Sequence, residues 1–216
     1  MNKLATVFSV GILAVSGGVS AEGNLSANFG DPDPSGIGYE WTVRGGYGMV
    51  DLIGSVGSKS AWEPKFELPN KGWTHTSDWI ALEVTKKVRL EVTVQRQAGF
   101  YELKVDRKDP TKRSYETAGS ELYPTLSVYE GWDTTTEKEQ GSFNPAGNFW
   151  STIMFKDVVY SAFGEDSVHY VTELEPGQYS LNIGGVNDLY CKADEPCGKG
   201  KHGYRATIKT SPMKMK

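Results

Sequence analysis

Reactive residues are scarce in this chain of 216 residues, which holds three histidines and two cysteines. The sequence has no Gly-x-Ser-x-Gly nucleophile elbow, no His-Glu-x-x-His zinc motif and no P-loop. These absences remove the common signatures of serine hydrolases, zinc metalloproteases and P-loop nucleotidases. Paired carboxylates can serve a glycosidase, but no pair stands out among the 27 acidic residues. The sequence therefore predicts a protein that is not an enzyme.

An excess of positive charge is also missing, because 23 basic residues face 27 acidic ones and the net charge is −4. A nucleic-acid partner usually requires a basic surface, so we expect none. Long apolar runs are missing after residue 21, so no later segment is predicted to span a membrane. The apolar stretch 46–57 contains Asp51 and four glycines, which weaken it as a helix.

Residues 1–21 have the pattern of a secretory signal peptide. Lys3 provides the positive charge, residues 4–15 are apolar, and residues 19–21 are the small residues that a signal peptidase recognises. The apolar run, about 12 residues long, is too short to cross a bilayer. We therefore expect export, with a mature chain that begins at Glu22 and is secreted, attached to the cell surface or periplasmic.

The two cysteines, Cys191 and Cys197, are separated by five residues. In an oxidising compartment a pair this close is expected to form a local disulfide. The alternative is a thiolate metal site, but zinc pairs usually lie closer together and the chain has no second pair. The spacing therefore favours a disulfide that constrains a loop.

Short β-rich runs separated by turn signals make up most of the remaining sequence. Residues 88–95 alternate strictly between apolar and polar, which predicts a strand with one buried and one wet face. Glu175-Pro-Gly177 and Gly184-Gly185 are typical of turns. The runs predicted as strands are 39–44, 79–84, 88–96, 101–106, 125–129, 158–163, 168–174, 178–184 and 204–209.

This many short strands, with no long helical periodicity, predicts an all-β fold: a single-domain antiparallel β-sandwich or jelly roll. We expect the domain to cover residues 39–210. Residues 22–38, rich in Gly, Pro, Asp and Ser, are predicted to be a flexible lead-in. Residues 211–216 are predicted to be a frayed tail.

The segment Trp73-Thr74-His75 is the strongest candidate for a functional site. In an extended strand, positions i and i+2 point to the same face, so the two rings would lie together. Imidazole is a good ligand for zinc, copper and nickel, and His169 lies in another predicted strand. Two imidazoles under-fill a zinc site, which takes four ligands, whereas Cu(I) accepts low coordination numbers. The residues therefore favour copper, provided that the two strands lie close together.

The Trp-Thr-His element resembles the copper(I)-binding surface proteins of methane-oxidising bacteria, the MopE and CorA type. In that family two histidines hold Cu(I) with a nitrogen of kynurenine, which forms from a tryptophan two residues before the first histidine. The resemblance implies that Trp73, His75 and His169 bind the metal. The segments 174–184 and 203–208 also resemble the last strands of secreted pre-peptidase C-terminal jelly-roll modules.

Other residues have simpler interpretations. His202 lies in a lysine-rich segment just before the last predicted strand, so we expect it to be a solvated loop residue. Asp31, Asp33 and Asp188 are loop carboxylates with the hardness that calcium prefers. They follow no repeat pattern, and they are compatible with a structural calcium whose ligands the sequence does not identify.

We therefore expect an exported copper(I)-binding protein that sequesters or scavenges copper at the cell surface or in the periplasm. Other surface or outer-membrane proteins are possible partners besides the copper ion. The alternative is a carbohydrate- or partner-binding jelly-roll module without metal. For that function Trp132 and Trp150, near predicted loops, are the candidates, whereas Trp79 is predicted to lie in the core.

Overall fold

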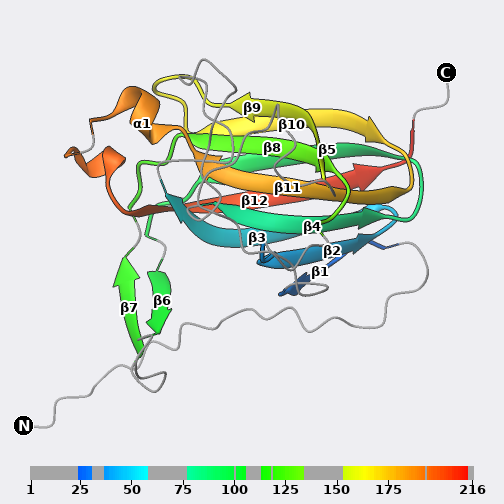
Figure 1. Ribbon diagram of the computed structural model, residues 1–216, viewed down its shortest axis with the longest axis horizontal. Helices are drawn as coiled ribbons and strands as arrows, with labels where there is room; N and C mark the ends of the chain where they lie inside the picture. Colours follow the sequence, from blue (N-terminus) through cyan, green and yellow to red (C-terminus); the bar gives the residue numbers. More distant parts are fainter. Residues whose placement is uncertain are drawn as a thin grey trace, which may run out of the picture.

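The protein is a β-sandwich of two packed sheets with six and four strands (Figure 1). The computed structural model describes residues 24–30, 37–57, 77–99, 101–105, 113–117, 119–133, 153–192 and 194–213. The six-stranded sheet has the order β1 (Ser26–Phe29), β2 (Trp41–Gly45), β4 (Asp78–Val84), β11 (Gly177–Gly185), β8 (Pro124–Glu130), β9 (Met154–Tyr160). The four-stranded sheet has the order β10 (Ser167–Leu174), β5 (Val88–Arg96), β12 (Lys201–Ser211), β3 (Gly48–Gly57).

The remaining described elements are small. Strands β6 (Tyr101–Val105) and β7 (Arg113–Thr117) form a separate antiparallel pair. A short helix, α1 (Asn187–Tyr190), and a 3-10 turn, Pro196–Gly198, follow β11. Within the two main sheets, β2 and β4 pair in parallel and the other named strand pairs are antiparallel. No helix in the described part of the chain has the length and apolarity needed to cross a membrane.

Alternating side chains from both sheets fill the space between them. On β5 the residues at even positions from 88 to 94 are buried, as the strict alternation predicts. Ile80, Leu82 and Val84 face them from β4. Each fully buried aliphatic side chain contributes about 1.5–3 kcal/mol relative to exposure, so this layer is the main source of stability.

A second apolar cluster lies on the opposite face of the six-stranded sheet. Trp79 and Tyr129 are fully buried there, with ring centroids 5.4 Å apart. Trp132 and Tyr39 belong to the same cluster. Trp79 is therefore a core residue, as the sequence predicts.

The sandwich predicted from the alternating runs is confirmed, although β1 and β3 of its two sheets and β7 of the separate pair were missed. The stretch 46–57 contains β3, in which Asp51 is exposed and Leu52 is buried. Strand β1 lies inside the predicted lead-in, 22–38, and pairs with β2. The sandwich therefore begins earlier in the chain than the sequence pattern indicates.

Candidate functional site

His169 is the predicted ligand that the structure describes, while Trp73 and His75 lie outside the described residues. His169 is exposed on β10, an edge strand of the four-stranded sheet. It pairs with Thr93 on β5, and its Nδ1 lies 3.0 Å from the Thr93 hydroxyl oxygen. Among the described residues the other ring nitrogen, Nε2, has no hydrogen-bond partner.

A polar row continues from His169 across the outer face of the sheet. Thr93 pairs with Thr207 on β12, and Thr207 pairs with Asp51 on β3. The Thr207 hydroxyl donates to Asp51 Oδ1 over 2.5 Å. The imidazole thus stands at the end of a row of hydrogen-bonding side chains that spans four strands.

The chain that contains Trp73 and His75 leads directly into β4 of the other sheet. Asp78, the first residue of β4, faces the sandwich interior, where its carboxylate accepts a hydrogen bond from the Tyr204 hydroxyl (2.7 Å). Whether the two imidazoles meet remains a prediction.

A pair of carboxyl groups, Glu40 and Asp78, lies beside this entry to β4. Burial, followed by the neighbouring Asp78 charge, raises the pKa of Glu40 to about 8, although the hydrogen bond from Trp79 N acts in the opposite direction. Glu40 is therefore largely protonated at neutral pH. The sequence contained a signal for Asp78, because it alternates in phase with the buried residues Ile80 and Leu82.

His202 is buried rather than solvated, so the sequence-based expectation was wrong. It lies within β12, is 1% exposed, and accepts a hydrogen bond from Glu121 N at Nδ1 (3.2 Å). Burial lowers the pKa of His202, against the opposing effect of the Cys197 and Lys199 backbone. The strand starts at Lys201, earlier than the pattern indicates, which moves His202 from a loop into the sheet.

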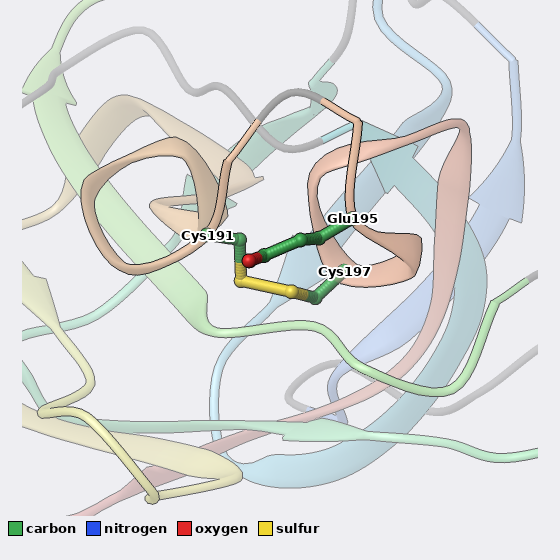
Figure 2. Close-up of side chains that lie close together, drawn as sticks. All are labelled: Cys191, Glu195 and Cys197. Atoms are coloured by element: carbon green, nitrogen blue, oxygen red, sulfur yellow. A yellow bond between two sulfur atoms is a disulfide. The ribbon is translucent and has the colours of Figure 1, made fainter.

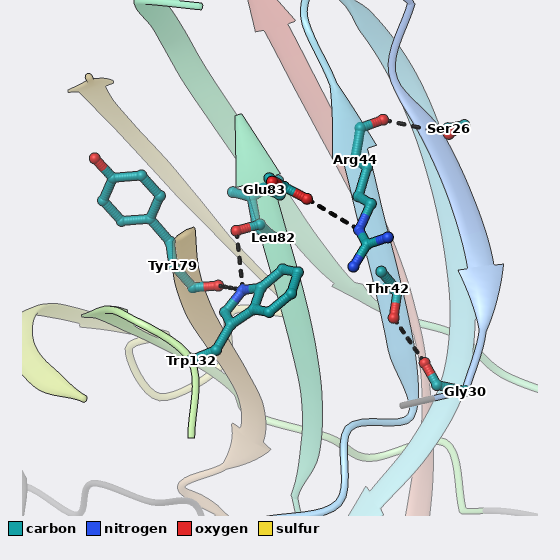
Figure 3. A network of polar contacts seen from close by, with 8 residues as sticks. All are labelled: Ser26, Gly30, Thr42, Arg44, Leu82, Glu83, Trp132 and Tyr179. Carbon is teal, nitrogen blue, oxygen red and sulfur yellow. Dashed lines mark hydrogen bonds and ion pairs between the residues drawn. The ribbon is translucent and has the colours of Figure 1, made fainter. Parts of the chain in front are cut away.

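Trp132 also differs from its interpretation as a sugar-binding residue. Its ring is 6% exposed, and its Nε1 donates to the carbonyl oxygens of Leu82 (3.2 Å) and Tyr179 (3.1 Å). Arg44 stacks on the ring at 5.2 Å and pairs with Glu83 (Figure 3). Trp132 is therefore a structural residue, and Trp150 lies outside the described residues.

The cysteine pair forms the predicted disulfide, with Cα atoms 6.0 Å apart (Figure 2). Glu195 lies beside it, and its carboxylate accepts a hydrogen bond from Lys192 N (2.9 Å). In the described part of the chain this is the one place where three groups of metal-ligating type lie within 4.8 Å. Because the sulfurs are bonded to each other, neither can act as a thiolate ligand.

The predicted calcium ligands are not brought together in the described structure. Asp31 and Asp33 lie outside the described residues, and Asp188 lies within α1, where its side chain is not described. A structural calcium remains a prediction.

No known protein-family model matches the chain, and no curated protein matches it. Among solved structures, its fold is similar to that of CorA, a surface-associated copper-binding protein important in Methylomicrobium album BG8 copper acquisition. The TM-score is 0.51 at 11% identity, over 74% of this chain and 93% of CorA.

Two weaker likenesses have TM-scores below 0.5. One is to the secreted protein MopE of Methylococcus capsulatus, in which an oxidized tryptophan facilitates copper binding (0.38, 14% identity, 75% of this chain, 84% of MopE). The other is to a pre-peptidase C-terminal domain of Bacillus anthracis collagenase (0.36, 10% identity, 78% of this chain, 94% of that domain). The likeness to CorA supports the fold alone.

Proposed function

We propose that this protein is an exported copper(I)-binding protein that sequesters copper at the cell surface or in the periplasm and is not an enzyme. The observation that carries the proposal is the Trp73-Thr74-His75 spacing together with an exposed, hydrogen-bonded His169. The CorA-like sandwich and the disulfide agree with this function and with export.

The contact between His169 and Thr93 suits a metal ligand. When Nδ1–H donates to the Thr93 hydroxyl, the lone pair of Nε2 is free to bind a metal. Metal-binding histidines usually hold their second nitrogen in this way, which fixes the ring and its tautomer. The Thr207–Asp51 hydrogen bond adds rigidity to the neighbouring position of the same row.

The proposed site contains His75 and His169 as nitrogen ligands, with Trp73 beside His75. By the family resemblance, Trp73 supplies the third position as kynurenine. Two or three nitrogen ligands favour Cu(I) over zinc, which takes four ligands. The role of the scaffold is to hold this low coordination number and to exclude further ligands.

Titration with Cu(I) in competition with a colorimetric chelator tests the proposal. We expect one equivalent to bind, with a loss of affinity of at least about tenfold in His75→Ala and in His169→Ala. Val171→Ala is the matched control, because Val171 lies on the same exposed face of β10. Unchanged Cu(I) affinity in both histidine variants would show that the site lies elsewhere.

The carbohydrate-binding alternative loses one of its two candidates, because Trp132 is buried against backbone carbonyl groups.

Mass spectrometry of protein from its native host tests the role of Trp73 separately. Conversion to kynurenine replaces an indole carbon by oxygen and adds a fixed mass to the peptide that contains position 73. An unmodified peptide with full copper occupancy would remove kynurenine from the proposal and leave the histidines.

A further inference from the structure

Three aromatic rings pack together on the surface beside α1, and we call them the aromatic platform: Tyr123, Phe163 and Tyr190. Phe163 lies nearly parallel to Tyr123, with centroids 5.9 Å apart and planes 17° apart. Tyr190 meets both rings edge-on, at 5.0 Å from Tyr123 and 5.6 Å from Phe163. Despite these contacts, Phe163 is 71% exposed.

The turn that carries Phe163 is closed by its own hydrogen bonds. Glu165 N donates to Ala162 O (3.1 Å), and Ala162 N donates to the Glu165 carboxylate (3.4 Å). Gly164 has a φ of +90°, a backbone conformation that residues with a side chain rarely adopt. The turn therefore holds an apolar ring out toward solvent in a defined position.

Tyr123 and Tyr190 are fixed by the disulfide loop. Tyr190 is the last residue of α1, its hydroxyl donates to Ser161 O (2.9 Å), and the next residue is Cys191 of the disulfide. Asn187 on the same helix accepts a hydrogen bond from Tyr123 N (2.8 Å). Asn187 also donates to Cys197 O (2.6 Å), so one amide joins the segment before β8 to the disulfide loop.

Rigidly held exposed aromatic rings are costly in water and are typical of binding surfaces. An aromatic side chain buries about 150–250 Å² when it is fully covered, and of the three rings Phe163 is largely exposed while Tyr123 and Tyr190 are already half-buried. The area that the platform offers is therefore below the roughly 800 Å² that each partner of a standard protein interface buries. The platform is therefore too small for a second copy of the chain. The exposed carboxylates Glu121, Glu165 and Asp166 beside it also disfavour an anionic lipid surface.

The rim of the platform is polar. The Glu165 carboxylate lies in the turn that carries Phe163, where it accepts a hydrogen bond from Ala162 N (3.4 Å), and the exposed Tyr160 directly precedes Ser161, whose carbonyl oxygen accepts the Tyr190 hydroxyl (2.9 Å). Burial raises the pKa of Tyr190, and the nearby Tyr160 and Glu165 add to this rise. Flat apolar rings bordered by hydroxyl and carboxylate groups suit a ligand that has an apolar face and a hydroxylated edge. A pyranose ring has both.

We propose that the aromatic platform binds a polysaccharide, with a sugar ring stacked on Phe163 and its hydroxyl groups bonded at the Tyr160–Glu165 rim. This site shares no residue with the proposed copper site and does not include Trp132, and it does not rest on copper binding. It gives the disulfide loop a role, because the loop holds two of the three rings in place before a ligand arrives and so reduces the entropy lost on binding.

Affinity electrophoresis of the whole protein without copper tests this proposal, with laminarin, xylan, galactomannan and dextran as the probes. We expect retardation by at least one polysaccharide, with a dissociation constant about tenfold weaker in Phe163→Ala. Phe29→Ala is the matched control, because Phe29 is similarly exposed on β1, at the opposite edge of the six-stranded sheet from β9.

Three results would overturn the proposal. The first is no retardation by any of the four polysaccharides. The second is equal retardation of the wild type and Phe163→Ala. The third is a dimer in solution that Phe163→Ala dissociates. Because Phe163 is largely exposed, its substitution is not expected to affect folding, and circular dichroism of the variant verifies this.

Discussion

The imidazole of His202 lies directly against Gly119: a Cβ built at position 119 would be 2.2 Å from its Nδ1. The two residues also form a backbone bridge, in which Gly203 N donates to Gly119 O (3.0 Å) and Gly119 N donates to Lys201 O (2.8 Å). Glu121 N then donates to the imidazole itself. This contact joins the segment before β8 to β12, an interior strand of the four-stranded sheet.

Substitution of Gly119 by alanine is expected to destabilise the protein by about 1–3 kcal/mol, because the new methyl group overlaps the buried ring. Urea unfolding followed by tryptophan fluorescence measures the change. Gly177→Ala is the control, since its Cβ would meet no atom closer than 3.8 Å. A free energy of unfolding that falls equally in both variants would contradict the close contact.

Protonation of His202 is expected to destabilise the fold in acid. Burial lowers the folded pKa below the ordinary value of 6.5, so the unfolded chain binds the proton more tightly. The stabilising contribution is complete above pH 6.5 and is lost as the pH falls through the folded pKa. Urea unfolding between pH 4.5 and 8 measures this effect. By linkage, the free energy of unfolding of His202→Asn should fall less steeply than that of the wild type as the pH decreases below 6.5. An unchanged slope would exclude this role.

Glu40 is expected to act in the opposite direction. Its folded pKa is about 8, above the ordinary 4.5, so its contribution is complete below pH 4.5 and is lost as the pH rises through about 8. Glu40→Gln mimics the protonated carboxyl and keeps an acceptor for Trp79 N. The variant should therefore lose less stability than the wild type as the pH rises from about 4.5 to about 8. Parallel stability profiles of the two proteins would contradict a raised pKa.

The proposed copper site gives Thr93 a positioning role. Thr93→Val removes the hydroxyl that contacts His169 Nδ1, and we expect Cu(I) affinity to fall by about tenfold while the ligands remain present. Chelator competition measures the affinity. Thr42→Val is the control, because it removes one threonine hydrogen bond, to Gly30 O (2.8 Å), in the other sheet. Equal affinities of all three proteins would show that Thr93 does not orient a ligand.

Loss of the Trp132 ring is expected to lower stability. Variant protein that remains folded is expected to bind polysaccharide like the wild type. Trp132→Ala should cost about 3–5 kcal/mol, because it leaves a cavity and two carbonyl groups without their donor. Thermal unfolding of the variant measures this cost. A change within about 0.5 kcal/mol, typical of a surface site, would argue against the buried position.

Much of the fold could be predicted because alternation is a direct consequence of strand geometry. Residues 88–96 show this most clearly, since each apolar position proved to face the core. Strand β3 was missed because its three glycines and Asp51 obscure the pattern. Asp51 is tolerated there because it lies on the outer face, where Thr207 hydrogen-bonds it. Only the pairing of β3 with β12 reveals that arrangement.

The candidate site could be predicted only in part. The sequence identified His169 as a residue in a strand, and the structure adds its Thr93 partner, which lies 76 residues away. His202 was misinterpreted because its lysine neighbours suggest solvent, whereas alternate residues of a strand face opposite ways. The aromatic platform joins residues from three separate segments of the chain, so no local pattern contains it.

The central place of β12 in the four-stranded sheet has a consequence for folding kinetics. This strand hydrogen-bonds to β5 on one side and β3 on the other, and Thr210 also donates to Gly46 O across 164 residues of sequence. Until β12 pairs with them, β5 and β3 each expose an unpaired edge and the four-stranded sheet cannot form. Such long-range pairing slows folding to roughly milliseconds to seconds. A delay of this kind suits a chain predicted to cross a membrane before it folds.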